Sequence, residues 1–294
     1  MEIIRPSDWA DYELIDTGTR EKLERFGKFV LARPEPQAVW SKALPDDEWK
    51  RMADAHYIRK PGGPEGERGE WIRKPGMPDQ WTVTYDLQGK PLHFRLGLTA
   101  FGHIGVFPEQ ASNWEYICKR LKERSSPGKV LNLFAYTGGA SLAARHMGAD
   151  VTHVDSVKPV ISWAREIMEA SGMDGIRWVV EDALKFVRRE AKRGNRYNGI
   201  ILDPPAYGRG PEGEKWVLEE SVNEMISLCN TILAPENAFI ILSLYSMGFS
   251  SLIGENLIRN HFQNIQDIES GELCFSDRNS RYLPLGTVVR AYRS

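Results

Sequence analysis

The pattern of hydrophobic and polar positions changes near residue 111. Before that point, short apolar or alternating runs typical of strands are separated by turn residues, and Asp86–Lys90 is typical of a hairpin connection. The segment Arg59–Gln80 is rich in glycine and proline, so we expect a long exposed loop. Residues 1–111 are therefore predicted to form a small β-rich N-terminal domain. Its expected strands include Phe29–Ala32, Trp81–Tyr85 and Leu92–Leu96.

From residue 112 onward, apolar runs of strand length alternate with amphipathic runs of helix length. Such repeated units with nearly all-apolar strands indicate a parallel sheet covered by helices on both faces. Residues 112–294 are therefore predicted to be an α/β domain. The expected strands are Val130–Phe134, Val151–Asp155, Arg177–Val180, Gly199–Asp203, Ala238–Leu244, Gln263–Glu269 and Thr287–Tyr292. The expected helices are Asn113–Glu123, Ala140–Met147, Lys158–Ala170, Ala183–Arg193, Lys215–Leu233 and Ser250–Asn260.

Composition narrows the functional classes. A hydrophobic content of 41% with 27% charged residues is typical of a globular protein. No apolar run approaches the roughly 18 residues that cross a bilayer, and the first residues lack a secretory signal, so we expect a cytoplasmic protein with no membrane partner. The net charge of −2 means that any nucleic-acid contact must use local patches. The three cysteines and six histidines show no metal-ligand spacing, so no metal is expected.

The expected strands of the α/β domain end in glycines and carboxylates that can bind a ligand at the edge of the sheet. Phe134–Gly139 follows the first strand, and its paired glycines let the backbone pass close to a ligand. The dehydrogenase fingerprint GxGxxG is absent. Asp155 ends the second strand, where a carboxylate can accept both hydroxyls of a ribose. Glu181 and Asp182 follow the third strand, where an acidic side chain can accept the adenine amino group. A structural turn, or helix capping by Asp155 or Asp182, is the alternative at each place.

The fourth strand ends in the strongest indication of a functional site in the chain. This is Asp203 followed by Pro204, Pro205, Ala206 and Tyr207. The two prolines forbid a helix and remove two N–H donors, so the turn exposes carbonyl acceptors beside a carboxylate. Such a corner can hold an exocyclic NH₂ group while Tyr207 stacks on its ring. Hydrogen bonds to fixed acceptors help to localise the lone pair of the amine and to aim it at a sulfonium methyl. A plain turn is the alternative.

These motifs, in this order, resemble those of class I S-adenosylmethionine-dependent methyltransferases. They are most similar to a bacterial large-subunit ribosomal RNA methyltransferase family, in which the first motif reads F-x-Y-T-G and the fourth D-P-P-x-F. Gly102–Gln110 also resembles the stretch that precedes the catalytic domain in that family. The resemblance spans Gly102–Arg293 and implies a Rossmann-like seven-stranded methyltransferase sheet. The motifs are Asn132–Gly139, Val154–Val157, Glu181–Ala183 and Leu202–Tyr207.

The resemblance implies S-adenosylmethionine as cofactor and S-adenosylhomocysteine as product. It implies that the methionyl end of S-adenosylmethionine binds at Phe134–Gly139, its ribose at Asp155 and its adenine at Asp182. The implied catalytic residues are Asp203, Pro204, Pro205 and Tyr207. The implied cofactor-binding residues are Phe107, Gln110, Asn132, Phe134, Ala135, Tyr136, Thr137, Gly138, Gly139, Asp155, Ser156, Glu181, Asp182, Ala183 and Asp203.

The leading hypothesis is methyl transfer to an exocyclic or ring nitrogen of a nucleobase in RNA, with ribosomal RNA as the expected substrate. Family members that methylate cytosine C5 carry a cysteine after the fifth strand, whereas Leu244–Met247 contains none, which disfavours C5 chemistry. Two alternatives stay open: a methyltransferase acting on a small molecule or a protein, and a noncatalytic module that binds the donor. The sequence leaves the oligomeric state open.

Overall fold

The computed structural model describes residues 2–59, 68–245 and 248–294. Ser246 and Met247, which belong to the segment expected to lack a cysteine, lie outside the described residues. The chain forms two compact units. The α/β unit consists of residues 2–6, 109–273 and 285–294, and the β-rich unit of residues 7–108 and 274–284.

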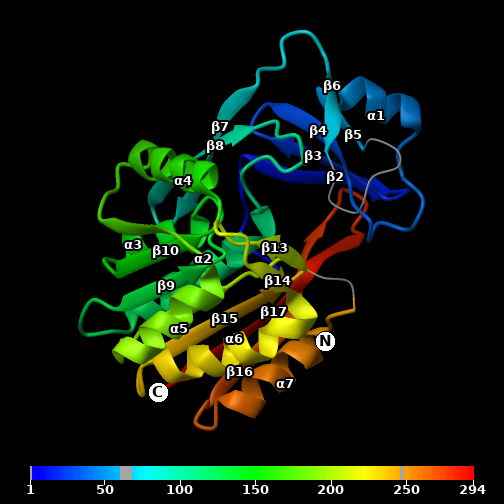
Figure 1. The fold of residues 1–294 in the computed structure, drawn as a ribbon. Coiled ribbons are helices and arrows are strands. Elements are labelled where there is room, and N and C mark those ends of the chain that lie inside the picture. The colour runs from blue at the N-terminus through cyan, green and yellow to red at the C-terminus, as the bar shows by residue number, and fades with distance from the viewer. Residues whose placement is uncertain (1, 60–67, 246–247) are drawn as a thin grey trace. The chain divides into compact units, whose positions relative to one another are not determined.

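The α/β unit is built on one large sheet (Figure 1), which has eight strands among the described residues. The strands from β15 to β11 run parallel, whereas β17 runs antiparallel to β15. In spatial order they are β1 (Glu2–Ile4), β16 (Asp267–Ser276), β17 (Tyr282–Arg293), β15 (Ala238–Leu244), β12 (Gly199–Leu202), β9 (Lys129–Leu133), β10 (Asp150–Asp155) and β11 (Ile176–Val180). The predicted α/β class and Rossmann-like sheet are confirmed, and β1 adds an eighth strand through parallel pairing with β16.

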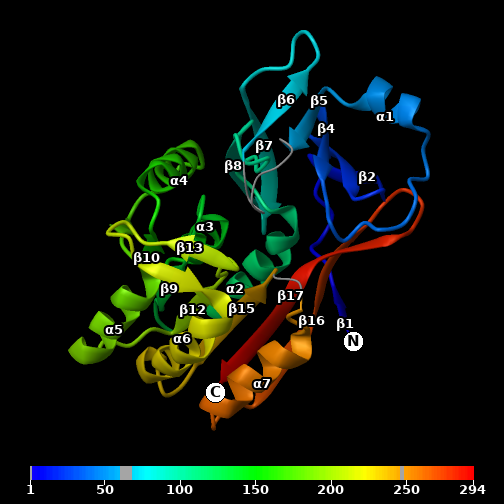
Figure 2. The same ribbon diagram turned by 45° about the vertical axis from the view of Figure 1, so that its right-hand side comes forward.

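Helices cover both faces of this sheet. Figures 1 and 2 show α5, α6 and α7 side by side along one face, where their apolar residues share a core with β9, β12 and β15. The opposite face carries α2, α3 and α4, on the side to which Asn132 and His153 point. The helices are α2 (Ala111–Lys122), α3 (Gly139–His146), α4 (Lys158–Ala170), α5 (Ala183–Arg193), α6 (Leu218–Ile232) and α7 (Ser251–His261), and a 3-10 turn, η1, covers Pro108–Gln110.

The helix expected at Lys215–Leu233 is wrong in its first three residues. These residues form β14 (Lys215–Val217), which pairs antiparallel with β13 (Tyr207–Arg209) as a short ribbon before α6. The physical reason is Trp216, whose buried indole donates a hydrogen bond to the carbonyl of Pro205 at 2.7 Å. This contact holds the segment extended against the double-proline turn.

The β-rich unit contains a five-stranded sheet and a two-stranded hairpin. The sheet has the order β2 (Tyr12–Gly18), β3 (Glu21–Phe26), β4 (Phe29–Pro34), β5 (Ala55–Arg59) and β6 (Gly69–Arg73), and α1 (Asp46–Met52) packs on it through Trp49. The hairpin joins β7 (Gln80–Leu87) to β8 (Lys90–Gly97), with Gln88 and Gly89 at positive φ, which confirms the expected connection. The loop expected at Arg59–Gln80 is wrong where β6 pairs with β5, and residues 60–67 lie outside the described residues.

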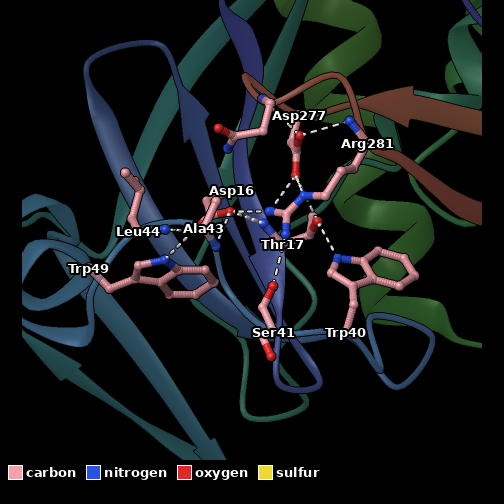
Figure 3. A network of polar contacts seen from close by, with 10 residues as sticks. Asp16, Thr17, Trp40, Ser41, Ala43, Leu44, Trp49, Asp277 and Arg281 are labelled. Atoms are coloured by element: carbon pink, nitrogen blue, oxygen red, sulfur yellow. Dashed lines mark hydrogen bonds and ion pairs between the residues drawn. The ribbon is translucent and has the colours of Figure 1, made fainter.

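A buried carboxylate organises one end of the β-rich unit (Figure 3). Asp16 is fully buried and accepts hydrogen bonds from five donors, which are the backbone N–H groups of Thr17, Ala43 and Leu44, the Trp49 indole and the Arg281 guanidinium. Arg281 also binds Asp277, whose other contacts include the Thr17 hydroxyl at 2.9 Å. This cluster fixes the arm 274–284 to the rest of the β-rich unit.

The compact units differ from the expected division into residues 1–111 and 112–294 at three places. Residues 2–6 belong to the α/β unit through β1, and residues 109–111 belong to it as well. The arm 274–284 belongs to the β-rich unit through the Asp16 cluster. That division into functional domains stays a prediction. Within the residues that the structure describes, no helix is long and apolar enough to cross a membrane.

We expect Asp16→Ala to lower the free energy of unfolding by about 3–5 kcal/mol, because it leaves the buried Trp49 indole and three backbone N–H groups without their acceptor. The measurement is chemical denaturation of the purified protein. Asp47→Ala, which removes an exposed carboxylate from α1, is the matched control and is expected to change stability by less than about 0.5 kcal/mol. Equal midpoints for the two variants would show that the Asp16 cluster does not stabilise the fold.

Candidate functional site

The parallel register brings three motif residues to one level of the sheet. Leu133 of β9 is paired with Val154 of β10 on one side and with Leu202 of β12 on the other. The next residues along these strands are Phe134, Asp155 and Asp203. The chain turns away from β9 in opposite directions here, toward β10 and β11 on one side and toward β12 and β15 on the other. This is the switch point at which parallel sheets bind ligands.

The loop after β9 adopts an unusual backbone conformation. Phe134 and Tyr136 have φ of 53° and 48°, and Gly138 has φ of 87°. A non-glycine residue in the left-handed region costs about 1–3 kcal/mol, so the surroundings must hold the loop in place. The N–H of Ala135 donates to the carbonyl of Val154 at 3.1 Å, and the N–H of Tyr136 donates to the Asp155 carboxylate at 2.9 Å. The loop is therefore fastened to the end of β10.

The two glycines of this loop have different roles. Gly138 precedes α3 in the left-handed conformation, which favours glycine. Gly139 lies against Trp114 of α2, where an added Cβ would stand 2.3 Å from the indole ring. Gly139 thus lets α2 and α3 approach closely, so its role is packing. Thr137 is buried, and the Ala135 side chain is almost fully enclosed.

A chain of hydrogen bonds supports the loop from below. Asn132 donates to the Ser141 hydroxyl at 2.9 Å, and that hydroxyl lies 3.1 Å from Nδ1 of His153. Burial lowers the pKa of His153 to about 3, although the backbone of Tyr136 opposes this shift. His153 is therefore neutral, and its ring lies directly beneath Gly138. Asn132 belongs to this supporting layer rather than to the surface of the loop.

Asp155 is largely enclosed and uses both carboxylate oxygens inside the protein. One oxygen accepts from Tyr136, and the other accepts from the N–H of Val157 at 2.9 Å. Burial raises the pKa of Asp155, and hydrogen bonds from the backbone of Val157, Tyr136 and Ser156 act in the opposite direction. The N-cap residue of α4 is Val157, so capping is not the main role of Asp155. Each oxygen keeps a lone pair that can accept from a ligand hydroxyl.

The acidic pair after β11 is occupied by structural contacts. Asp182 caps α5 by accepting from the N–H of Lys185 at 2.8 Å, which is the alternative that the sequence left open. Glu181 forms an ion pair with Arg189, and its N–H donates to the carbonyl of Asp155 at 3.2 Å. Ala183 is buried in the core. Within the residues that the structure describes, the second carboxylate oxygen of Asp182 has no hydrogen-bond partner.

The turn after β12 presents fewer acceptors than the sequence suggests. The carbonyl of Pro205 accepts from Trp216, and the carbonyl of Ala206 accepts from the N–H of Leu218 at 2.9 Å. In the part of the chain that the structure describes, the carbonyl of Pro204 and the Asp203 carboxylate have no hydrogen-bond partner. Loss of hydration raises the pKa of Asp203 to about 7. The available acceptors are thus one carbonyl and one carboxylate.

Two aromatic side chains lie beside the turn after β12. The Tyr207 side chain is 52% exposed, so its ring is free to contact a planar ligand. Trp216 packs against Phe134, with ring centroids 4.8 Å apart, and joins the loop after β9 to the turn after β12. Trp216 could not be found from the sequence, because a lone tryptophan in an expected helix carries no signal of this contact.

A buried polar network holds Gln110. The side chain of Asn113 donates to Gln110 at 2.7 Å and lies 3.2 Å from the hydroxyl of Ser243 at the end of β15. Arg290 binds Asn113 from the other side, at 2.8 Å, and also binds Glu269. These partners were missed because they are far apart in the sequence.

Phe107 belongs to the β-rich unit, where its ring lies edge-on to His103 at 5.4 Å between centroids. Its expected place beside the donor stays a prediction. Among the described residues, no group of three or more His, Cys, Asp or Glu side chains is placed to hold a metal ion.

Comparisons with known proteins agree with this arrangement. A family model described as S-adenosylmethionine-dependent methyltransferase matches residues 65–255. The crystal structure of the SAM-dependent methyltransferase from Agrobacterium tumefaciens is 36% identical, covers 100% of this chain and 94% of its own, and has a TM-score of 0.90. The putative methyltransferase SMU.776, solved in complex with SAH, shares the fold at 18% identity, with a TM-score of 0.69 and coverage of 97% of this chain and 76% of its own.

Among curated proteins, the ribosomal RNA large subunit methyltransferase K/L of Shewanella frigidimarina is 30% identical over 152 residues. The match covers 50% of this chain and 20% of that protein. The chain therefore spans about a fifth of the length of this relative.

The buried, neutral His153 predicts how stability depends on pH. The pKa of His153 is about 3 in the folded protein and about 6.5 in an unfolded chain, so unfolding takes up a proton at pH values between these two. The contribution is fully present above about pH 6.5 and is lost as the pH falls toward 3. We expect the melting temperature to drop between pH 7 and pH 5, and His153→Gln to reduce that drop.

The measurement is thermal denaturation of both proteins at several pH values. His261→Gln, at the end of α7, is the control and is expected to keep the pH dependence of the parent protein. A His153→Gln variant with the same pH dependence as the parent would contradict the neutral, buried state of this ring.

Proposed function

The chain belongs to the S-adenosylmethionine-dependent methyltransferase family, and on that premise we propose that it methylates a nitrogen of a nucleobase in RNA. Its methyl donor is S-adenosylmethionine, which supplies a methyl group on a positively charged sulfur. The proposal concerns the molecule that accepts the methyl group. The observation that carries the proposal is the pair of free acceptors at Asp203 and Pro204, next to the exposed ring of Tyr207.

We propose that the donor binds along the ends of β9, β10 and β11. The Asp155 carboxylate keeps lone pairs for the ribose hydroxyls, and Asp182 keeps one oxygen for the adenine amino group. The loop Phe134–Gly139 faces the methionyl end with its backbone. The positive φ of Phe134 and Tyr136 supports this role, because backbone strain of this kind recurs in loops that hold a ligand. Ser156 and Gln110 are proposed as further contacts.

We propose that the acceptor amine binds at the turn after β12. An exocyclic NH₂ group has two protons, and the Asp203 carboxylate and the Pro204 carbonyl can each accept one of them. These two hydrogen bonds draw the nitrogen lone pair out of the ring and direct it toward the methyl group. Tyr207 would stack on the base, whereas Pro205 contributes by holding Trp216. Positioning supplies most of the rate in this scheme.

RNA is supported by the named relatives. The matching region of the Shewanella frigidimarina protein lies in a ribosomal RNA large subunit methyltransferase, so we propose ribosomal RNA as the substrate and the cytoplasm as the place of action. An unpaired nucleotide fits the corner better than a paired one, because the amine and the flat face of the base must both be reached.

A labelling experiment tests the substrate class. The purified protein is incubated with methyl-labelled S-adenosylmethionine and with ribosomal RNA from a strain that lacks the protein. We expect label on a base nitrogen in this RNA and much less in RNA from the parent strain, which already carries the mark. Label in the small-molecule or protein fraction alone would overturn the proposal, and so would donor binding with no transfer to any fraction.

Asp203 predicts the pH dependence of the reaction. With a pKa of about 7, the carboxylate is an acceptor mainly above neutral pH, so kcat/KM should rise through pH 7 and then level off. Asp203→Ala should lower kcat by about 100-fold or more, because one positioned partner of the amine is lost. Asp203→Asn keeps a carbonyl acceptor that does not titrate, so it should retain part of the activity and lose the rise near pH 7.

The measurement is initial rate against pH, with the affinity for the donor as the test of an intact fold. Asp174→Asn, which changes a carboxylate that is 94% exposed, is the matched control. If Asp203→Ala keeps the activity of the parent protein, Asp203 does not hold the acceptor.

A further inference from the structure

The ribbon of β13 and β14 directly follows Asp203 and Pro204, the proposed acceptor-binding residues, in the α/β unit (Figure 1). Its two strands pair in the register Tyr207 with Val217, Gly208 with Trp216, and Arg209 with Lys215. Directly paired residues share one face of an antiparallel ribbon, and the faces alternate along each strand. Trp216 is buried against the corner, so its face points inward. Tyr207, Arg209 and Lys215 therefore share the outward face.

The two cations on this face differ from most basic residues of α5 in their lack of a close carboxylate partner. Four of the five basic residues of α5 each form an ion pair with a carboxylate, namely Lys185, Arg188, Arg189 and Arg193. In the described part of the chain, Arg209 is exposed and has no ion pair or hydrogen bond through its side chain. Lys215 makes one contact, to Glu220 at 3.9 Å, and both of these side chains are more than half exposed.

The acidic residues of the ribbon do not neutralise its outward face. Glu212 and Glu214, in the turn between the strands, both bind Lys185 of α5. Glu214 also accepts from the N–H of Glu212 at 2.9 Å. An exposed pair such as that of Lys215 contributes little to stability, so an anionic ligand could replace Glu220 at small cost.

Resting on the proposed function, we propose that Arg209 and Lys215 bind the backbone phosphates that flank the target nucleotide. Tyr207 and Arg209 are two residues apart on one face, which places them about 7 Å from each other along the strand. A base stacked on Tyr207 therefore has its own phosphates within reach of both long cationic side chains. The substrate class at this site is then an unpaired segment of a polynucleotide, held by one stacked base and two phosphates, rather than a free base or nucleoside.

The test compares Arg209→Gln, Lys215→Gln and the double variant with the parent protein. Each is assayed for methylation of the ribosomal RNA used above, over a series of salt concentrations. We expect KM for the RNA to rise roughly tenfold for each substitution, and the slope of log KM against log salt to fall by about 0.7 for each lost phosphate contact. The affinity for S-adenosylmethionine is expected to stay unchanged, which also shows that the variants are folded.

Lys192→Gln is the matched control, because it removes the same charge from an exposed lysine in the last turn of α5. It should leave both KM and the salt slope unchanged. If Arg209→Gln and Lys215→Gln also leave them unchanged while the parent protein methylates RNA, the phosphate contacts are wrong and the proposed function stands. If the parent protein methylates no RNA, the proposed function fails, and this inference fails with it.

Discussion

The parallel register of β9, β10 and β12 is the constraint on which the candidate site depends. It sets the residues after Leu133, Val154 and Leu202 at one level, so a backbone loop and two carboxylates start from the same edge. A register shift of one residue would turn every side chain of the shifted strand to the other face and would separate Tyr136 from Asp155. The apolar residues that pack against α5 and α6 resist such a shift, and in this way the core determines the geometry of the site.

Three enclosed aspartates show how the number of internal donors separates structural carboxylates from available ones. Asp16 accepts from five donors and organises the arm of the β-rich unit. Asp155 accepts from the backbone and keeps part of its capacity. Asp203 has no partner within the described residues, and burial raises its pKa to about 7. A carboxylate that the protein buries without donors is suited to a ligand that brings its own.

Local signals predicted the elements around the site well. The helices Lys158–Ala170 and Ala183–Arg193 match the structure, because a proline in the first turn, the cap at Asp182 and the left-handed Gly194 act within a few residues. The strand Ala238–Leu244 also matches, since a fully buried strand has a continuous apolar run.

Contacts between segments far apart in the chain could not be predicted from local sequence patterns. β14 was assigned to a helix because the bond between Trp216 and Pro205 joins two sides of a turn. Arg290 supports Gln110 through Asn113, which lies 177 positions away from Arg290, and this contact leaves no pattern in either segment. The pairing of β1 with β16 likewise joins two distant segments, so residues 2–4 showed no sign of it. The roles of the site residues themselves rest on motif resemblance and stay proposals.

The arm 274–284 also bears on how the protein is synthesised. Asp16 and its cationic partner Arg281 are 265 positions apart, so Asp16 is synthesised long before Arg281. Until Arg281 emerges, the Asp16 carboxylate has its donors from residues 17–49 but lacks its counter-charge. Because the arm follows residues 109–273 in the chain, the β-rich unit acquires its last contact only after most of the α/β unit has been synthesised.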